Sequence, residues 1–210
     1  MPTLFLPTGL VLNNQSDFTI FMEDIYMLDH FLIKNCAPTL SSLKTGNLFN
    51  CPSSSRKKTD AIISHWNKLL NPKGVSIHIL HRRAEKALVY VCRKSKLKQD
   101  FQKPGVKEFL VKYGYSEFSF ECCIDRLKER IANSESFPHE IGLFLGYPLG
   151  DVKGFIENEG RNFLCCGEWK VYCDACSAGN SFRQYKKCRD VYVKLFEGRI
   201  RTVYQLTVSV

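Results

Sequence analysis

The sequence predicts an α+β fold, mainly helical with a small antiparallel or mixed sheet, and three observations lead to this prediction. Apolar residues recur at helical spacing in several segments, first between Asp24 and Lys34. Val75, Ile77 and Ile79 alternate with polar residues, which is the pattern of a half-buried strand. No internal repeat is visible. Helical and strand-like segments follow one another irregularly, which is typical of the α+β class.

Turn and capping residues place the elements in the first half of the chain. The first helix is expected to end near Asn35, and Pro38 suits the first position of a short helix that stops near Gly46. Thr59 or Asp60 is a suitable N-cap for the next helix. These signals predict helices over 24–34, 38–46 and 59–70, and a hairpin of strands over 75–79 and 87–92.

The second half of the chain reads mainly as helices separated by glycine and proline. Gly114 and Gly146 stand where helices end, and Pro148 stands where one begins. The predicted elements are helices over 95–101, 104–113, 120–132, 137–145, 148–158 and 181–196, and strands over 162–166, 169–173 and 202–208.

The composition of the 210 residues is that of a globular protein, with 44% apolar and 24% charged residues. It excludes wholesale disorder, collagen-like repeats and coiled coil. Residues 1–20 are expected to form a loose arm, and residues 21–210 a single domain. A possible subdivision lies near residue 135, in the polar stretch Asn133–Ser136.

The apolar runs and the cysteines together predict the cellular location of the protein. No run approaches the roughly 18 apolar residues that a membrane-spanning helix needs, and the first residues do not resemble a secretory leader. Ten cysteines include two adjacent pairs, Cys122-Cys123 and Cys165-Cys166, which do not suggest a disulfide framework. We therefore expect reduced thiols, a cytoplasmic location and no membrane association.

The positive charge is concentrated in one region. The chain carries a net charge of +9, and the basic region, residues 51–110, alone carries +10. Such a region either forms solvated surfaces with no partner or attracts a polyanion, an acidic protein partner or an anionic small molecule.

Cys36-Ala37-Pro38 is the first segment that carries chemistry. If Pro38 opens a helix, Cys36 lies at its N-cap, where unpaired N–H groups and the helix dipole stabilise a thiolate. Such a position lowers a thiol pKa from about 8.5 to roughly 3.5–7.5. Lys44 follows two turns later and adds a positive charge. The alternative interpretation is a buried cysteine beside a helix start.

Pro138-His139-Glu140 begins the second such segment. With Gly146 and Pro148 it predicts a helix, a tight turn and a second helix. His139 and Glu140 then lie in the first helical turn, where the carboxylate interacts favourably with the helix dipole. The alternative for the histidine is a cap or a core contact.

These segments resemble a known bacterial family. The strings CAPTL at 36–40, KTGNLF at 44–49, ALVYV at 87–91, FPHEIGLFLGYP at 137–148, DVKGFI at 151–156 and WKVY at 169–172 are similar to the family known as "domain of unknown function 3793". The resemblance runs from about residue 20 to the C-terminus. It implies a stand-alone bacterial cytosolic protein and no particular reaction or cofactor.

The favoured functional hypothesis is a small-molecule or redox-associated pocket protein. Its catalytic candidates are Cys36 as thiolate, His139 as proton carrier and Glu140 beside it. Helix N-termini hold anions, which motivates this choice. The ligand-binding candidates are Lys44, Tyr147 and Lys170.

A binding module is the second hypothesis, with the basic region as the contact for nucleic acid or an acidic partner. Segment 137–160 also fits a helix-turn-helix, but it is acidic and Asp151 would face outward. Binding of DNA phosphates through it is therefore not favoured.

A metal site is the third hypothesis. Cys165, Cys166, Cys176 and Cys188 offer thiolate ligands, whereas a lone C-x-x-C at 173–176 is a weak signal. Cys173 also stands where members of the similar family tend to have glycine. No metal site is favoured.

Overall fold

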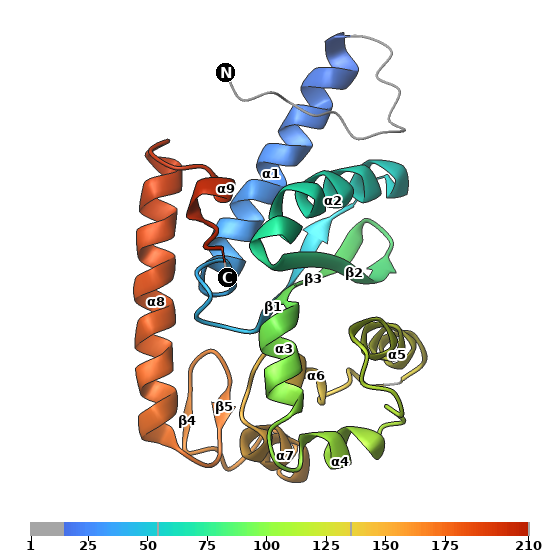
Figure 1. The fold of residues 1–210 in the computed structure, drawn as a ribbon, viewed down its shortest axis with the longest axis vertical. Coiled ribbons are helices and arrows are strands. Elements are labelled where there is room, and N and C mark those ends of the chain that lie inside the picture. Colours follow the sequence, from blue (N-terminus) through green and yellow to red (C-terminus); the bar gives the residue numbers. More distant parts are fainter. Residues whose placement is uncertain (1–14, 54, 135, 210) are drawn as a thin grey trace.

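The computed structural model describes residues 15–53, 55–134 and 136–209, and it confirms a mainly helical α+β fold with small antiparallel sheets (Figure 1). The helices are α1 (Gln15–Leu40), α2 (Arg56–Leu70), the 3-10 turn η1 (Asn71–Lys73), α3 (Lys94–Phe101), α4 (Val106–Val111), α5 (Phe120–Asn133), α6 (Ile141–Phe144), α7 (Leu149–Glu157), α8 (Ala175–Glu197) and α9 (Val203–Leu206). The strands are β1 (Gly46–Pro52), β2 (Val75–Arg83), β3 (Lys86–Arg93), β4 (Cys165–Cys166) and β5 (Lys170–Val171).

The larger sheet separates two hydrophobic cores. Its strands are antiparallel in the order β1-β3-β2. Figure 1 shows α1 and α2 on one side of it and α3 to α7 on the other. Alternation along β3 supplies both cores, because Val89 and Val91 pack with α1 and α2 whereas Tyr90 and Cys92 pack with α3 to α6.

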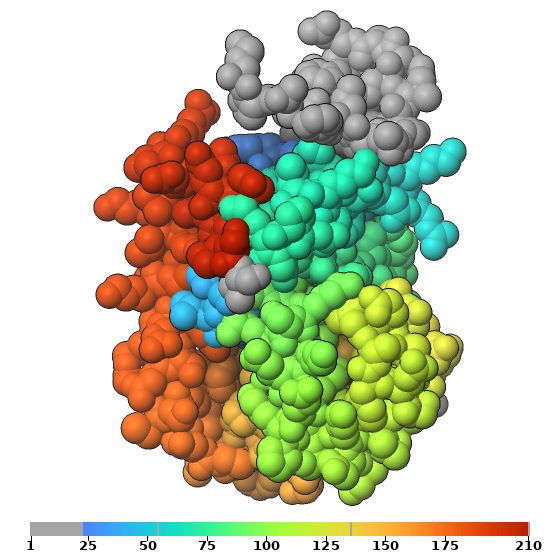
Figure 2. Space-filling view, viewed as in Figure 1, coloured from blue at the N-terminus to red at the C-terminus, as the bar shows by residue number. Residues whose placement is uncertain are grey.

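The C-terminal part of the chain covers one flank. Helix α8 packs along α1, and the α8–α9 segment forms one edge of the molecule in the space-filling view (Figure 2). A short hairpin, β4–β5, precedes α8 and packs against α7. Across the described ranges, none of the helices combines the length and apolar character that crossing a membrane requires.

The expected helix start at Pro38 is wrong. Helix α1 continues through Pro38 and ends at Leu40. Its buried stripe Leu28, Leu32, Cys36 and Leu40 has the i, i+4 spacing of one helix face, so the apolar pattern does not stop at residue 34. Pro38 has no backbone N–H, so α1 lacks the hydrogen bond that this position would otherwise donate to the carbonyl of Lys34.

The end of α1 is held by a residue far away in sequence. The buried guanidinium of Arg93 donates hydrogen bonds to the carbonyl oxygens of Thr39 and Leu40, at 2.7 and 2.6 Å. It also donates to Lys73 O and Val208 O. Arg93 thus satisfies the last carbonyls of the helix and ties three chain segments together.

Three other expectations need correction. The separate helix expected over 38–46 does not form, because residues 38–40 belong to α1 and residues 41–45 form a turn that leads into strand β1. In β1 the buried positions Phe49 and Cys51 alternate with exposed Asn50 and Pro52. Residues 202–208 contain helix α9 instead of a strand, because Thr202 and Gln205 form a capping box. Of the expected arm, residues 1–14 lie outside the described residues, whereas residues 15–20 belong to α1.

Candidate functional site

A cavity of about 330 Å³ lies between α6, α7 and the β4–β5 hairpin, and we call it the hairpin pocket. Three of the six predicted site residues line it: His139, Tyr147 and Lys170. Its other lining residues are Ile141, Gly142, Leu145, Asp151, Val152, Phe155, Cys166, Gly167, Glu168 and Trp169. The lining is mostly apolar with a few polar groups, which is the usual character of a small-molecule site.

Close packing between α6 and α7 forms one wall of the hairpin pocket. A Cβ atom on Gly142 would lie only 2.8 Å from Val152 Cγ2, so the glycine lets the two helices approach. Gly146 has a φ of 82° and forms the turn between the helices. The predicted order of helix, tight turn and helix is therefore confirmed, with α6 shorter than expected.

Asp151 anchors the hairpin that forms the opposite wall. Its carboxylate is buried and accepts hydrogen bonds from Trp169 Nε1 at 2.7 Å and from the backbone N–H groups of Tyr172 and Cys173 at 2.7 and 2.9 Å. The expectation that Asp151 faces outward is wrong, because these three donors hold its side chain inside. Charge-assisted bonds of this kind fix the hairpin firmly on α7.

Aromatic rings give the hairpin pocket its shape. The Trp169 indole stacks on Tyr147, with ring centroids 4.8 Å apart, and meets the Phe182 ring of α8 edge-on. Phe155 lies against the His139 ring, at a centroid distance of 4.9 Å. These flat surfaces suit a ligand with a planar apolar part.

Two polar side chains remain at the wall and rim of the pocket. Lys170 donates a hydrogen bond to Gly160 O at 2.8 Å, and its ammonium lies over the rings of Phe155 and Phe163. An ammonium has three donors, so this one keeps two for other partners. His139 is exposed at the rim. Glu168, also in the lining, is held by Arg189 at 2.7 Å.

Glu140 does not line the hairpin pocket. Its side chain is buried and forms an ion pair with Arg130 of α5, with Nε and Oε1 2.8 Å apart. The two neighbours in sequence thus point to different places, His139 to the pocket rim and Glu140 into the contact with α5.

Lys44 lies just behind the hairpin pocket. Its ammonium is 5.2 Å from the centroid of the Tyr147 ring and 6.0 Å from that of Tyr185. The side chain is 4% exposed and forms no hydrogen bond or ion pair with the described residues. Burial lowers the pKa of Lys44 to about 8, although the nearby Glu168 carboxylate acts in the opposite direction.

Cys36 is enclosed in the core at the C-terminal end of α1 and is absent from the pocket lining. Burial raises the pKa of its thiol well above the ordinary value, and the charges of Lys44 and Arg189 offset this only in part. The negative end of the helix dipole also disfavours a thiolate there. The helix start that motivated the nucleophile role is absent, and the structure does not bring Cys36 and His139 into one cavity.

The four cysteines of the metal hypothesis are not gathered into a site. Among the described residues there is no group of three or more His, Cys, Asp or Glu side chains arranged to hold a metal ion. Cys166 and Cys176 are exposed, whereas Cys188 donates to Ser41 Oγ at 3.2 Å.

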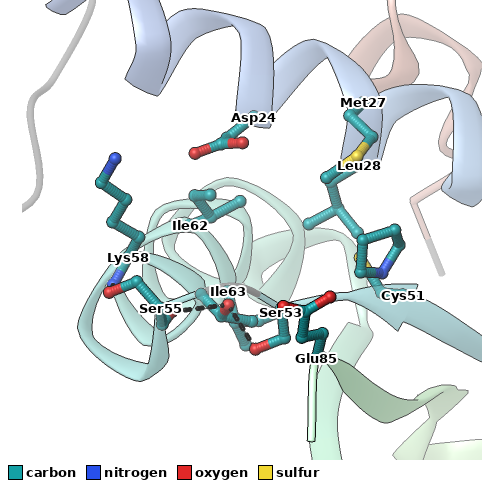
Figure 3. A pocket seen from close by; sticks show the side chains of 12 residues that line it. Asp24, Met27, Leu28, Cys51, Ser53, Ser55, Lys58, Ile62, Ile63 and Glu85 are labelled. Atoms are coloured by element: carbon teal, nitrogen blue, oxygen red, sulfur yellow. Dashed lines mark hydrogen bonds between the residues drawn. The ribbon is translucent and has the colours of Figure 1, made fainter. Parts of the chain in front are cut away.

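A second cavity, of about 200 Å³, lies between α1, α2 and the end of β1, and we call it the interhelix pocket. Figure 3 shows Asp24 and Met27 of α1 across the hollow from Ile62 of α2 and from Ser53. Burial, with the Asp24 charge, raises the pKa of Cys51 on its floor to about 11. It contains none of the predicted site residues, so the hairpin pocket is the better candidate.

A family model described as "Protein of unknown function (DUF3793)" matches residues 32–207. The chain belongs to this family. No curated protein and no solved structure matches the chain. The matched range of the DUF3793 model contains the whole hairpin pocket, together with Lys44 and Cys36.

Sequence reasoning missed the residues that build the DUF3793 pocket. Asp151, Trp169 and the Glu168–Arg189 pair were not among the site candidates. A signal was present, because Asp151 and Trp169 each open one of the strings that resemble the family. Their contact could not be predicted from the sequence, since they are 18 positions apart.

Proposed function

We propose that the protein binds a small molecule with a planar apolar part and one anionic group in the hairpin pocket. The observation that carries this proposal is the combination of aromatic walls and a lysine in one hollow of about 330 Å³. That volume is within the usual range for small-molecule sites, about 300–1,000 Å³.

The aromatic rings account for the apolar part of the ligand. Trp169 is held by Asp151 and by stacking on Tyr147, so its face is positioned before a ligand arrives. A preorganised wall adds affinity because little conformational entropy is lost on binding. Phe155 offers a second apolar surface across the hollow.

Lys170 accounts for the anionic group. The hydrogen bond to Gly160 O fixes the ammonium, and the two donors that remain can bind a carboxylate or phosphate. In this proposal His139 adds a hydrogen bond from the rim. Lys44 acts indirectly, as a positive charge behind Tyr147. The proposal assigns no step to Cys36 or Glu140.

The test uses naphthalene-2-carboxylate and its uncharged carboxamide as probes. The protein has two tryptophans, and Trp66 lies in the other core, so W66F leaves Trp169 as the fluorescent reporter. We expect saturable quenching, with the carboxylate binding about tenfold more tightly than the carboxamide, since an ionised partner strengthens the hydrogen bond.

The matched variants are K170M and K153M, which each remove one lysine charge. In K170M the two probes should bind equally. Lys153 is an exposed lysine of α7, so K153M should still bind the carboxylate more tightly than the carboxamide. Non-saturable quenching, or a preference that survives in K170M, would contradict the proposal.

A cytoplasmic location and a bacterial source remain predictions. The location is consistent with the packing of Cys36, Cys51, Cys92 and Cys123 as small apolar side chains in the two cores.

A further inference from the structure

A further recess, separate from the hairpin pocket, lies at the tip of the three-stranded sheet. It has a volume of about 540 Å³, and we call it the sheet-tip cavity. Its walls include Asn50 of β1, His81 and Arg83 of β2, Lys86 of β3, and Ile131 and Ser134 from α5 and the segment after it. The basic region in sequence supplies four of its lining residues, His81, Arg83, Lys86 and Leu88, and the cavity lies on the α5 face of the sheet.

A β-bulge brings two basic residues into this cavity. Ile79 pairs with Val89 and His81 pairs with Leu88, so Leu80 is an extra residue in β2. Strict alternation would place His81 and Arg83 on the same face as Ile79, toward α2. The extra residue moves them to the face of Leu80, which packs in the core on the α5 side.

The same bulge places Arg82 on the face of the sheet opposite to that of Arg83. Arg82 lies on the α2 face, where it forms an ion pair with Asp60 and donates to Ser53 Oγ. Arg82 and Arg83 are therefore neighbours in sequence with different environments. Arg82 has a carboxylate partner, whereas Arg83 has no ion pair with any described residue.

Two positive charges face each other at the tip of the hairpin. Arg83 is directly opposite Lys86 in the β2–β3 register. Like charges in that position destabilise a sheet. None of the described lining residues carries a carboxylate, and Glu85 of the turn lines the interhelix pocket on the other face. Glu135 lies outside the described residues.

We propose that the sheet-tip cavity binds a small anion of the phosphate, pyrophosphate or phosphate-ester class that carries two or more negative charges. The Arg83 guanidinium offers a planar pair of donors that matches two phosphate oxygens, and Lys86 adds a second charge. Asn50 and Ser134 supply neutral polar groups beside them. A bound anion of this kind removes the repulsion between the two cations, which is otherwise uncompensated among the described residues. The recess favours a compact ligand over an extended polymer.

Calorimetry with inorganic pyrophosphate tests this proposal. We expect saturable binding at about 10 mM salt that weakens at about 150 mM, because screening shortens the Debye length from about 30 Å to about 8 Å. R83Q and K86Q should each weaken binding about tenfold. R82Q removes the same charge from the opposite face and should change the affinity by less than about twofold. K170M should leave it unchanged, which separates this site from the hairpin pocket.

A stability measurement distinguishes a ligand site from a structural role. K86E replaces the like-charge pair with an opposite-charge pair across from Arg83, so it should raise the Tm while abolishing pyrophosphate binding. A K86E protein with a lowered Tm would overturn the argument from repulsion.

Three other outcomes would overturn the proposal. The first is no saturable pyrophosphate binding by the intact protein. The second is pyrophosphate binding that appears only in the E135Q variant. That result would mean that the Glu135 carboxylate pairs with Arg83 and Lys86 in the wild type. The third is tighter binding of a DNA duplex with equal losses in R82Q, R83Q and K86Q. That result would assign the charges to a nucleic-acid surface.

Discussion

The two proline-containing segments, at Cys36–Pro38 and Pro138–Glu140, look alike in sequence but occupy opposite ends of helices. Pro38 lies in the last turn of α1, and its neighbour Cys36 belongs to the buried stripe of that helix. Pro138 precedes α6 in a genuine turn, and His139 is exposed. A proline marks a helix start only where the apolar spacing also begins, and at Pro38 that spacing is already under way.

The two segments also bury charge in different ways. Lys44, which follows the first segment, is enclosed by aromatic rings without a carboxylate within ion-pair distance among the described residues. Glu140 of the second segment is enclosed with Arg130 as its partner. A paired buried charge is retained as a unit, whereas an unpaired one shifts its pKa.

The largest loss of stability is expected when the hydrogen bonds that cap the C-terminal end of α1 are removed. R93M removes four hydrogen bonds from a guanidinium to backbone carbonyls. The carbonyls of Thr39 and Leu40 then keep only their bonds from Ser42 N and Val208 N. We expect a loss of about 4 kcal/mol in the free energy of unfolding, measured by urea denaturation. R93K keeps the charge but not the planar fork, and it should lose less. A loss below about 1.5 kcal/mol in R93M would show that α1 does not depend on this cap.

The next effect concerns the ion pair of the second segment. R130M leaves a buried carboxylate without a partner and should cost about 3 kcal/mol. E140Q should cost about 1 kcal/mol, because the Arg130 side chain is 27% exposed and can turn to water. The double variant should be close to E140Q. Thermal and urea unfolding measure all three, and the reverse order of R130M and E140Q would contradict the assignment of the buried partner.

The elements that could be predicted from the sequence are those whose signals are local. The β2–β3 hairpin follows from alternation, and α5 and α7 follow from caps and apolar spacing. The apolar spacing through Leu40 does indicate that the first helix runs past Pro38. The contact that holds its end could not be predicted, because Arg93 is 53 positions from Leu40. The tail could have been predicted as helical, since Thr202 and Gln205 have the spacing of a capping box.

The candidate site was predictable only in part. His139, Tyr147 and Lys170 were found because they stand in or beside recognisable strings, and they line one cavity. Asp151 looked like an exposed residue of a polar helix face, and only the position of the hairpin shows that it is buried. The bulge that aims Arg83 has no sequence signal of its own, because a single extra residue leaves the composition of a strand unchanged.

The last prediction concerns how stability depends on pH, and it tests the contrast between the unpaired charge of Lys44 and the paired charge of Glu140. Burial lowers the pKa of Lys44 from its ordinary value of 10.5 to about 8. Between pH 8 and 10 the unfolded chain therefore binds more protons at this residue than the folded chain, so the contribution of Lys44 to stability rises with pH. Below pH 8 both states are protonated, and the folded protein carries the full cost of the buried ammonium.

K44M isolates this contribution. The difference in unfolding free energy between the wild type and K44M should shift by about 2 kcal/mol in favour of the wild type between pH 8 and pH 10. Burial also raises the pKa of Tyr90 and Cys92, which lowers stability at high pH, but both proteins contain these groups and the difference removes them. K153M, which removes the charge of an exposed lysine in α7, is the matched control. A difference that stays constant from pH 8 to pH 10 would mean that Lys44 keeps an ordinary pKa. Its ammonium would then have a partner, as Glu140 has in Arg130.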